Sequence, residues 1–133
     1  MRKSSLAAAA SAIATLALAA GWLTAGWARA QPVGDAAKGK DAFDEQCSQC
    51  HTIGSVGQGP NLAGVVGRKA GTSPGFPYTP AMKAAGLTWT PANLEKFLAN
   101  SQAMVPGTAM AVSVPSAAER ASIVAYLARQ MVR

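Results

Sequence analysis

Cysteine and histidine are scarce in this chain of 133 residues, which holds two cysteines and one histidine. All three lie within residues 47–51, so the rest of the chain offers neither residue type as a further ligand or cross-link. A structural zinc ion needs four Cys, His or carboxylate ligands, and this supply is too small. A disulfide between Cys47 and Cys50 would close too small a loop to constrain the unfolded chain. Zinc binding and disulfide stabilisation are therefore both disfavoured.

Strand patterns and basic clusters are also missing. After the N-terminal segment, apolar and polar residues do not alternate as they do in a half-buried strand, so we expect an all-α domain with long loops. The formal charge is +6, but removing Arg2, Lys3 and Arg29 of the N-terminal segment leaves 9 of the 12 basic residues against 6 acidic ones. The basic residues are scattered singly, which argues against nucleic-acid binding.

One long hydrophobic run is present, at the N-terminus. Residues 1–30 begin with two basic residues, continue through an uncharged stretch rich in Ala and Leu, and end in Ala28-Arg29-Ala30, a small-x-small pattern. This segment predicts a signal peptide that is removed before Gln31, leaving one domain over residues 31–133 in the periplasm. The run is also long enough to span a bilayer, so an uncleaved anchor is the alternative. Alanine partitions weakly into membranes, which favours cleavage.

Helical periodicity predicts a helix near each end of the domain. The first helix starts near Asp35, a suitable N-cap, and its apolar face carries Ala36, Gly39, Phe43 and Cys47. A glycine inside a helix costs roughly 1 kcal/mol against alanine, so Gly39 indicates a close helix crossing. The last helix opens with the capping box Ser116 to Glu119 and has an apolar stripe formed by Ile123, Val124, Leu127 and Met131.

The middle of the domain is predicted to hold shorter helices. One spans about residues 80–85, and another runs from Thr90, an N-cap followed by Pro91, to about Asn100. Its buried line contains Leu94, Phe97 and Leu98. Residues 52–78 are rich in glycine and proline, which predicts loops.

Residues 47–51 read Cys-Ser-Gln-Cys-His, the C-x-x-C-H pattern of covalent haem attachment. Positions three apart share a helix face, so Cys47 and Cys50 can both reach the vinyl groups of one haem, and His51 can bind the iron. A dithiol redox pair of the thioredoxin kind would need a fold rich in strands. The pattern therefore predicts one haem c, held by two thioethers.

The second axial ligand separates an electron carrier from a haem enzyme or gas sensor, because the latter two leave one iron position open. No second histidine exists, so a methionine thioether is the candidate. Met131 lies on the stripe of the last helix, and Met82 has no obvious approach from its short helix. Met104 and Met110 flank the turn Pro106-Gly107, and spacing alone leaves both open.

From Gly34 to Met131 the chain resembles the class I cytochrome c family at separated points that follow in the same order. These points are Gly34-Asp35, Gly39, Phe43, the haem motif, Gly59-Pro60-Asn61-Leu62, Gly67-Arg68-Lys69, Phe76-Pro77-Tyr78-Thr79, Trp89, Pro106-Gly107-Thr108-Ala109-Met110 and Ala125-Tyr126-Leu127. The resemblance implies the small cytochrome c fold, in which the N- and C-terminal helices cross at Gly39, Phe43 and Tyr126. Shorter helices and long loops then wrap one haem.

The resemblance also implies roles for individual side chains. Met110 becomes the second iron ligand, and the Pro60 carbonyl accepts a hydrogen bond from His51. Tyr78 and Trp89 would bind a haem propionate. Arg68 would compensate the propionate charge, and Thr108 would hydrogen-bond near the Met110 loop.

A single-haem electron carrier, with no enzymatic activity and no small-molecule substrate, is the implied function. Implied partners are membrane redox complexes: a quinol-oxidising cytochrome bc complex, and a terminal oxidase or photosynthetic reaction centre. We expect a monomer. A haem enzyme or gas-binding sensor with an open iron position is the alternative.

Three features depart from the family pattern. The loop from His51 to Pro60 is short, and Phe97 stands where the family often has a tyrosine whose hydroxyl reaches toward the methionine sulfur. Positions around the haem edge that are often lysine in the mitochondrial proteins read Gln46, Gln102, Ala103 and Ala109. We therefore expect partner docking that depends on apolar contact more than on charge.

Overall fold

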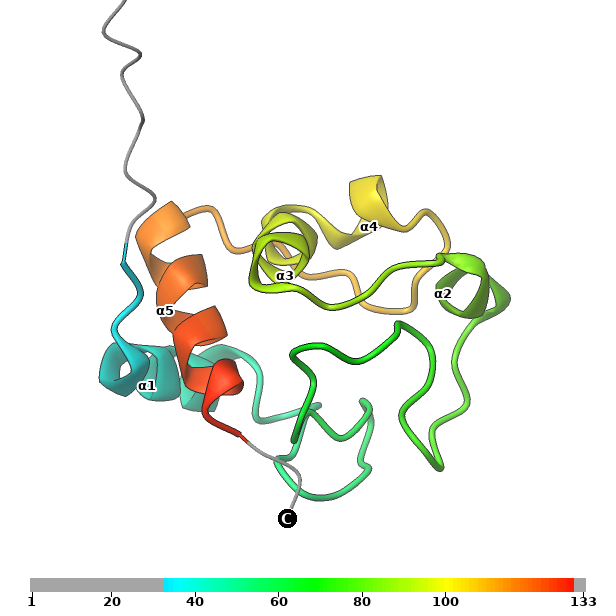
Figure 1. Cartoon of the computed structure of the whole chain (residues 1–133), viewed down its shortest axis with the longest axis horizontal. Helices are drawn as coiled ribbons and strands as arrows, with labels where there is room; N and C mark the ends of the chain where they lie inside the picture. Colours follow the sequence, from blue (N-terminus) through cyan, green and yellow to red (C-terminus); the bar gives the residue numbers. More distant parts are fainter. Residues whose placement is uncertain (1–32, 131–133) are drawn as a thin grey trace, which may run out of the picture.

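The computed structural model describes residues 33–130, so the expectations for residues 1–30 and for Met131 lie outside the described residues. The helices are α1 (Ala36–Gln46), α2 (Pro80–Ala84), α3 (Pro91–Ala99), α4 (Ser101–Met104) and α5 (Ala117–Ala128) (Figure 1). An isolated antiparallel bridge joins Lys69 to Thr88. The expected all-α class is confirmed. Between residues 33 and 130, no helix has the length and apolar character needed to cross a membrane.

Helices α1 and α5 cross each other, as the glycine inside α1 indicated (Figure 1). A Cβ atom on Gly39 would lie 1.9 Å from the Ser122 carbonyl oxygen, so the two backbones meet there. One turn later the rings of Phe43 and Tyr126 pack with their centroids 5.4 Å apart. The crossing expected for the terminal helices is therefore confirmed.

Side-chain caps start the helices where the sequence indicated them. The Asp35 carboxylate accepts from the Ala37 and Lys38 amides, and the Thr90 hydroxyl accepts from the Asn93 amide. Ser116 likewise accepts from the Glu119 amide. The expected return bond from the Glu119 carboxylate to Ser116 is wrong for the described structure, because that carboxylate accepts from the Gln46 side chain at 2.6 Å.

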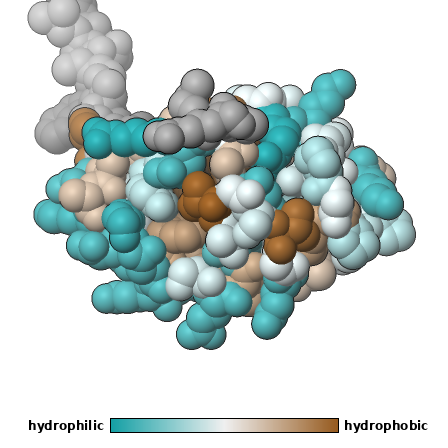
Figure 2. Space-filling view, turned by 90° about the horizontal axis from the view of Figure 1, so that it is seen from below, coloured by the Kyte–Doolittle hydropathy of each residue, from teal (hydrophilic) through white to brown (hydrophobic). Residues whose placement is uncertain are grey.

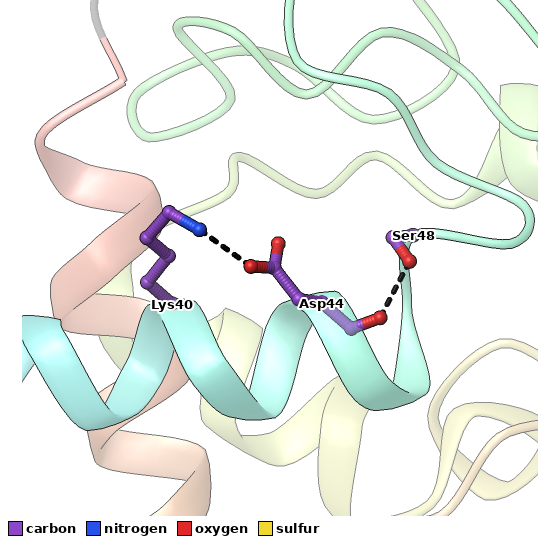
Figure 3. A network of polar contacts seen from close by, with 3 residues as sticks. All are labelled: Lys40, Asp44 and Ser48. Atoms are coloured by element: carbon purple, nitrogen blue, oxygen red, sulfur yellow. Dashed lines mark hydrogen bonds and ion pairs between the residues drawn. The ribbon is translucent and has the colours of Figure 1, made fainter.

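Two polar contacts shape the end of α1 (Figure 3). The Lys40 ammonium lies 2.5 Å from the Asp44 carboxylate, and this bond raises the pKa of Lys40. Both side chains are exposed, so the ion pair contributes little to stability. The Ser48 hydroxyl donates to the Asp44 carbonyl oxygen at 2.5 Å. This bond satisfies a carbonyl at the helix end and holds the turn that leads into residues 47–51.

The core lies between α1, α3 and α5 and extends under the loops. Its members are apolar side chains from every helix except α4, together with loop residues: Phe43, Val65, Ala70, Met82, Trp89, Leu94, Phe97, Leu98, Val105, Val114, Ile123, Val124 and Leu127. Within the described residues, the large apolar side chains that are exposed are Val33 and Val56. The face in Figure 2 is accordingly mostly hydrophilic, with small separate apolar areas.

Candidate functional site: a haem cavity

A cavity of about 410 Å³ opens within the core between the α1–α5 pair, α2 and α3. Its volume lies within the roughly 300–1,000 Å³ that small-molecule and cofactor sites occupy. Every site residue predicted from the sequence lines it: Cys47, Cys50, His51, Pro60, Arg68, Tyr78, Trp89, Thr108 and Met110. Much of the remaining wall is apolar, with contributions from Leu62, Val65, Leu94, Phe97 and Ile123.

A second hollow of about 480 Å³ lies at the surface beside α1 and α5. Its lining is largely charged, with Asp35, Lys38, Asp41, Glu45 and Glu119 among its residues. None of the predicted site residues lines it. The apolar cavity is therefore the candidate site.

His51 is held at the wall by backbone contacts on both sides. Its amide donates to the Cys47 carbonyl at 2.8 Å, which closes a helical turn through the Cys-Ser-Gln-Cys-His motif. Its ring Nδ1 lies 3.1 Å from the Pro60 carbonyl oxygen. A carbonyl accepts only, so Nδ1 carries the proton and Nε2 keeps the lone pair that can bind a metal ion.

Gly59 makes room for this imidazole. A Cβ atom on Gly59 would lie 2.5 Å from Cε1 and 2.6 Å from Nδ1 of His51. The Gly59 amide donates to the Cys50 carbonyl at 2.7 Å, so the loop returns directly onto the motif. The short loop from His51 to Pro60 is thus held by this hydrogen bond beside the His51 imidazole.

Cys47 is half-buried and Cys50 is exposed, and the two are not joined in a disulfide. Burial raises the pKa of the Cys47 thiol to about 11, and the negative charge of Glu119 adds to this shift. The sulfur of Cys47 is therefore neutral at pH 7. A thioether is also uncharged and suits the same apolar wall.

The Arg68 side chain hydrogen-bonds the backbone of the preceding loop at Asn61 and Ala63. Its guanidinium donates to the Asn61 carbonyl at 2.7 Å and to the Ala63 carbonyl at 3.0 Å. Burial lowers the pKa of Arg68, but arginine stays charged at physiological pH. Arg68 therefore places a fixed positive charge in the cavity wall, which suits a ligand that carries carboxylates.

Trp89 and Tyr78, the two aromatic residues predicted for the site, differ in burial and in their aromatic partners. Trp89 is buried and its ring packs on Phe97 with centroids 5.0 Å apart. Its amide donates to the Arg68 carbonyl at 2.9 Å, which joins the two residues through the backbone. Tyr78 is half-buried and meets Phe76 edge to face at 4.9 Å.

The three described methionines differ in whether they line the cavity. Met110 is half-buried and lines the cavity, whereas Met104 packs against the core without lining the cavity. Met82 is buried and also lines the cavity, so the expectation that it has no approach is wrong. The reason is that α2 lies directly against the cavity, which the sequence of a five-residue helix does not reveal.

Hydrogen bonds fix the backbone on both sides of Met110. The Thr108 hydroxyl accepts from the Met110 amide at 3.3 Å. The Ser101 hydroxyl donates to the Met110 carbonyl at 2.7 Å, and the Gln102 side chain donates to the Thr108 carbonyl at 2.8 Å. Ser101 was not predicted from the sequence, since a lone serine at a helix start carries no signal of a partner nine residues away.

The donor set fits a covalent haem. Two thiols, one oriented imidazole, methionine thioethers and one guanidinium meet in an otherwise apolar cavity. A porphyrin needs an apolar slot for its ring, axial donors for its iron and a cation for its carboxylates. Each requirement has a residue in this wall.

The model of the family described as "Cytochrome c" matches residues 36–130. The chain belongs to the cytochrome c family. Cytochrome c2 of Rhodomicrobium vannielii is 47% identical over 107 residues, covering 77% of this chain and 85% of that protein. Cytochrome c of Tetrahymena pyriformis is 48% identical over 98 residues, covering 72% and 89%. The solved structure of cytochrome cH from Methylobacterium extorquens superposes with a TM-score of 0.69 at 42% identity, covering 71% of this chain and 98% of that chain.

As a cytochrome c, the chain carries one covalent haem c and transports electrons. The small cytochrome c fold expected from the resemblance is confirmed. Cys47 and Cys50 stand in the C-x-x-C-H motif of covalent haem attachment.

Proposed function

We propose that this cytochrome c is a periplasmic single-electron carrier in which His51 and Met110 would hold the haem iron. Cys47 and Cys50 would form the thioethers, and Arg68, Tyr78 and Trp89 would hold the propionates. Haem c supplies reversible one-electron chemistry at its iron. The protein then needs no catalytic residue and no substrate pocket.

The observation that carries the proposal is the convergence of all these residues on one cavity. They span 63 positions of the sequence, from Cys47 to Met110, and they line the same apolar wall. His51 turns its protonated Nδ1 toward the Pro60 carbonyl at 3.1 Å, which leaves Nε2 for the iron. An apolar enclosure of this kind excludes water and keeps both axial donors in place through a change of charge.

The chain's own residues have separate tasks in this account. The Pro60 carbonyl orients the imidazole, and the Ser101 and Thr108 hydroxyls hold the backbone of Met110. Arg68 keeps a positive charge beside the cavity while it ties the loop at Asn61. Rigid axial donors keep the reorganisation on electron transfer small, which is what a carrier needs.

The absorption spectrum of the holoprotein tests the axial ligand. We expect Met110→Ala to abolish the weak sulfur-to-iron band, whereas Met104→Ala and Met82→Ala retain it. Reduced Met110→Ala should bind carbon monoxide readily, and the reduced wild type should resist it. The proposal would be contradicted if the band survived in Met110→Ala. It would also be contradicted if the reduced wild type bound carbon monoxide readily, and this second result would favour a haem enzyme or gas sensor.

The compartment and partners are part of the proposal. Residues 1–30 act as a signal peptide, and the domain of residues 31–133 exchanges electrons with a quinol-oxidising cytochrome bc complex and with a terminal oxidase or photosynthetic reaction centre. The intact mass of protein from a periplasmic extract should correspond to a chain that starts at Gln31 and carries one haem. Recovery of the full-length chain in the membrane fraction would instead indicate an uncleaved anchor.

A further inference from the structure

Ser101 is one of the most deeply buried side chains in the described structure, with 1% of its surface exposed. Its hydroxyl donates to the Met110 carbonyl at 2.7 Å and lies 3.2 Å from the Val112 carbonyl. A buried hydroxyl is costly unless it is hydrogen-bonded, so this residue is suited to a polar task. Both of its partners belong to the segment that carries Met110 along the cavity.

The position of Ser101 is itself fixed. It is the first residue of α4, and the Asn100 side chain caps that helix by accepting from the Ala103 amide at 3.0 Å. The Val105 amide donates to the Ser101 carbonyl at 2.9 Å. The hydroxyl thus projects from a rigid helical turn and not from a loose loop.

A weaker contact supports the same carbonyl. The exposed side chain of Gln102 donates to the Thr108 carbonyl at 2.8 Å and lies 3.3 Å from the Met110 carbonyl. Water can replace this exposed donor, whereas it cannot easily take the place of the buried Ser101 hydroxyl. Ser101 and Gln102 therefore make a strong and a weak hydrogen bond to the same Met110 carbonyl.

We propose that Ser101 is a positioning residue for Met110. Its hydroxyl anchors the Met110 carbonyl to α4 and so keeps the Met110 sulfur from leaving the iron. Ser101 does not line the cavity, so it acts through the backbone of Met110. The inference rests on the proposed function, because it takes Met110 as the axial ligand.

The test is a titration of the ferric holoprotein with imidazole, which competes with the methionine for the iron. Loss of the hydroxyl leaves the Met110 carbonyl with only the longer contact to Gln102, so Ser101→Ala should lower the apparent imidazole dissociation constant roughly five- to tenfold. Gln102→Ala should lower it about twofold, because its donor is exposed. The sulfur-to-iron band should disappear in parallel as imidazole is added.

Ser122→Ala is the matched control, since Ser122 is also buried and its hydroxyl donates to the Ala118 carbonyl at 2.9 Å in α5. It should lower the unfolding temperature and leave imidazole binding unchanged. An unchanged dissociation constant in Ser101→Ala, or an equal change in Ser122→Ala, overturns the proposal. If Ser101→Ala does not fold, an unchanged constant in Gln102→Ala overturns it.

Met110→Ala separates this inference from the function on which it rests. If Met110→Ala keeps the sulfur-to-iron band, the assignment of the ligand fails and the role of Ser101 fails with it. If Met110→Ala loses the band and Ser101→Ala binds imidazole like the wild type, only the role of Ser101 fails. The two failures are thus distinguishable in one set of spectra.

Discussion

The Nδ1 atom of His51 lies 3.1 Å from the carbonyl oxygen of Pro60, and the preceding residue, Gly59, packs against the same ring. Gly59 is buried against the imidazole, where a Cβ atom would come within 2.5 Å of the ring. The orientation of the proposed axial ligand therefore depends on a residue that has no functional group.

Gly59→Ala should displace the imidazole from the Pro60 carbonyl. We expect a loss of about 2–3 kcal/mol in the free energy of unfolding of the holoprotein, because the site is overpacked. Urea unfolding followed by circular dichroism measures it. The control is Gly57→Ala in the same loop, where a Cβ atom would have its nearest neighbour at 3.5 Å. Equal stability of the two variants would contradict the role assigned to Gly59.

Gly39→Ala separates helix propensity from helix packing. Propensity alone would make alanine about 1 kcal/mol more stable in α1. The new Cβ atom would lie 1.9 Å from the Ser122 carbonyl, so we expect a destabilisation of about 3 kcal/mol or more, measured by urea unfolding. The reverse exchange at an exposed position of α1, Ala37→Gly, should cost less than about 1 kcal/mol. A stabilised Gly39→Ala would show that the helices can separate.

The starts of the helices and the haem motif could be predicted because they depend on residues close together in the sequence. The caps Asp35, Thr90 and Ser116 start their helices where the sequence indicated, because capping depends on residues within one turn. The Cys-Ser-Gln-Cys-His motif is equally local. By contrast, α4 was missed because four residues are too few to show a helical period.

Contacts between distant residues could not be read in advance. The Glu119 carboxylate bonds Gln46, which is 73 positions away, and not its expected partner in the capping box. The choice between Met104 and Met110 depends on which side chain reaches the cavity, and that follows from the path of the chain after α4. Spacing holds no information about that path. The assignment of Met110 as ligand stays a prediction.

Arg68→Ala should loosen the loop that carries Asn61. Removing a charged donor leaves the Ala63 carbonyl without its partner and the Asn61 carbonyl with only the Ser73 hydroxyl at 3.4 Å, which should cost about 2–3 kcal/mol of unfolding free energy. Arg68→Lys should recover less than half of this, because an ammonium cannot reproduce the planar fork of two donors. Urea unfolding of both holoproteins measures the difference, with the exposed neighbour variant Lys69→Ala as the control. Full recovery by lysine would indicate that charge alone matters.

Electron exchange with a purified cytochrome bc complex should depend weakly on salt. Among the described residues that line the haem cavity, Arg68 is the one with a charged side chain. The exposed lining residues include the uncharged Gln46, Gln58 and Ala109. Between about 10 mM and 150 mM salt the screening length falls from about 30 to 8 Å, and we expect the second-order rate constant to fall less than about threefold. Ala109→Lys should steepen this dependence, whereas Ala37→Lys on the exposed side of α1 should not. A steep fall for the wild type would mean that charges outside the cavity wall guide docking.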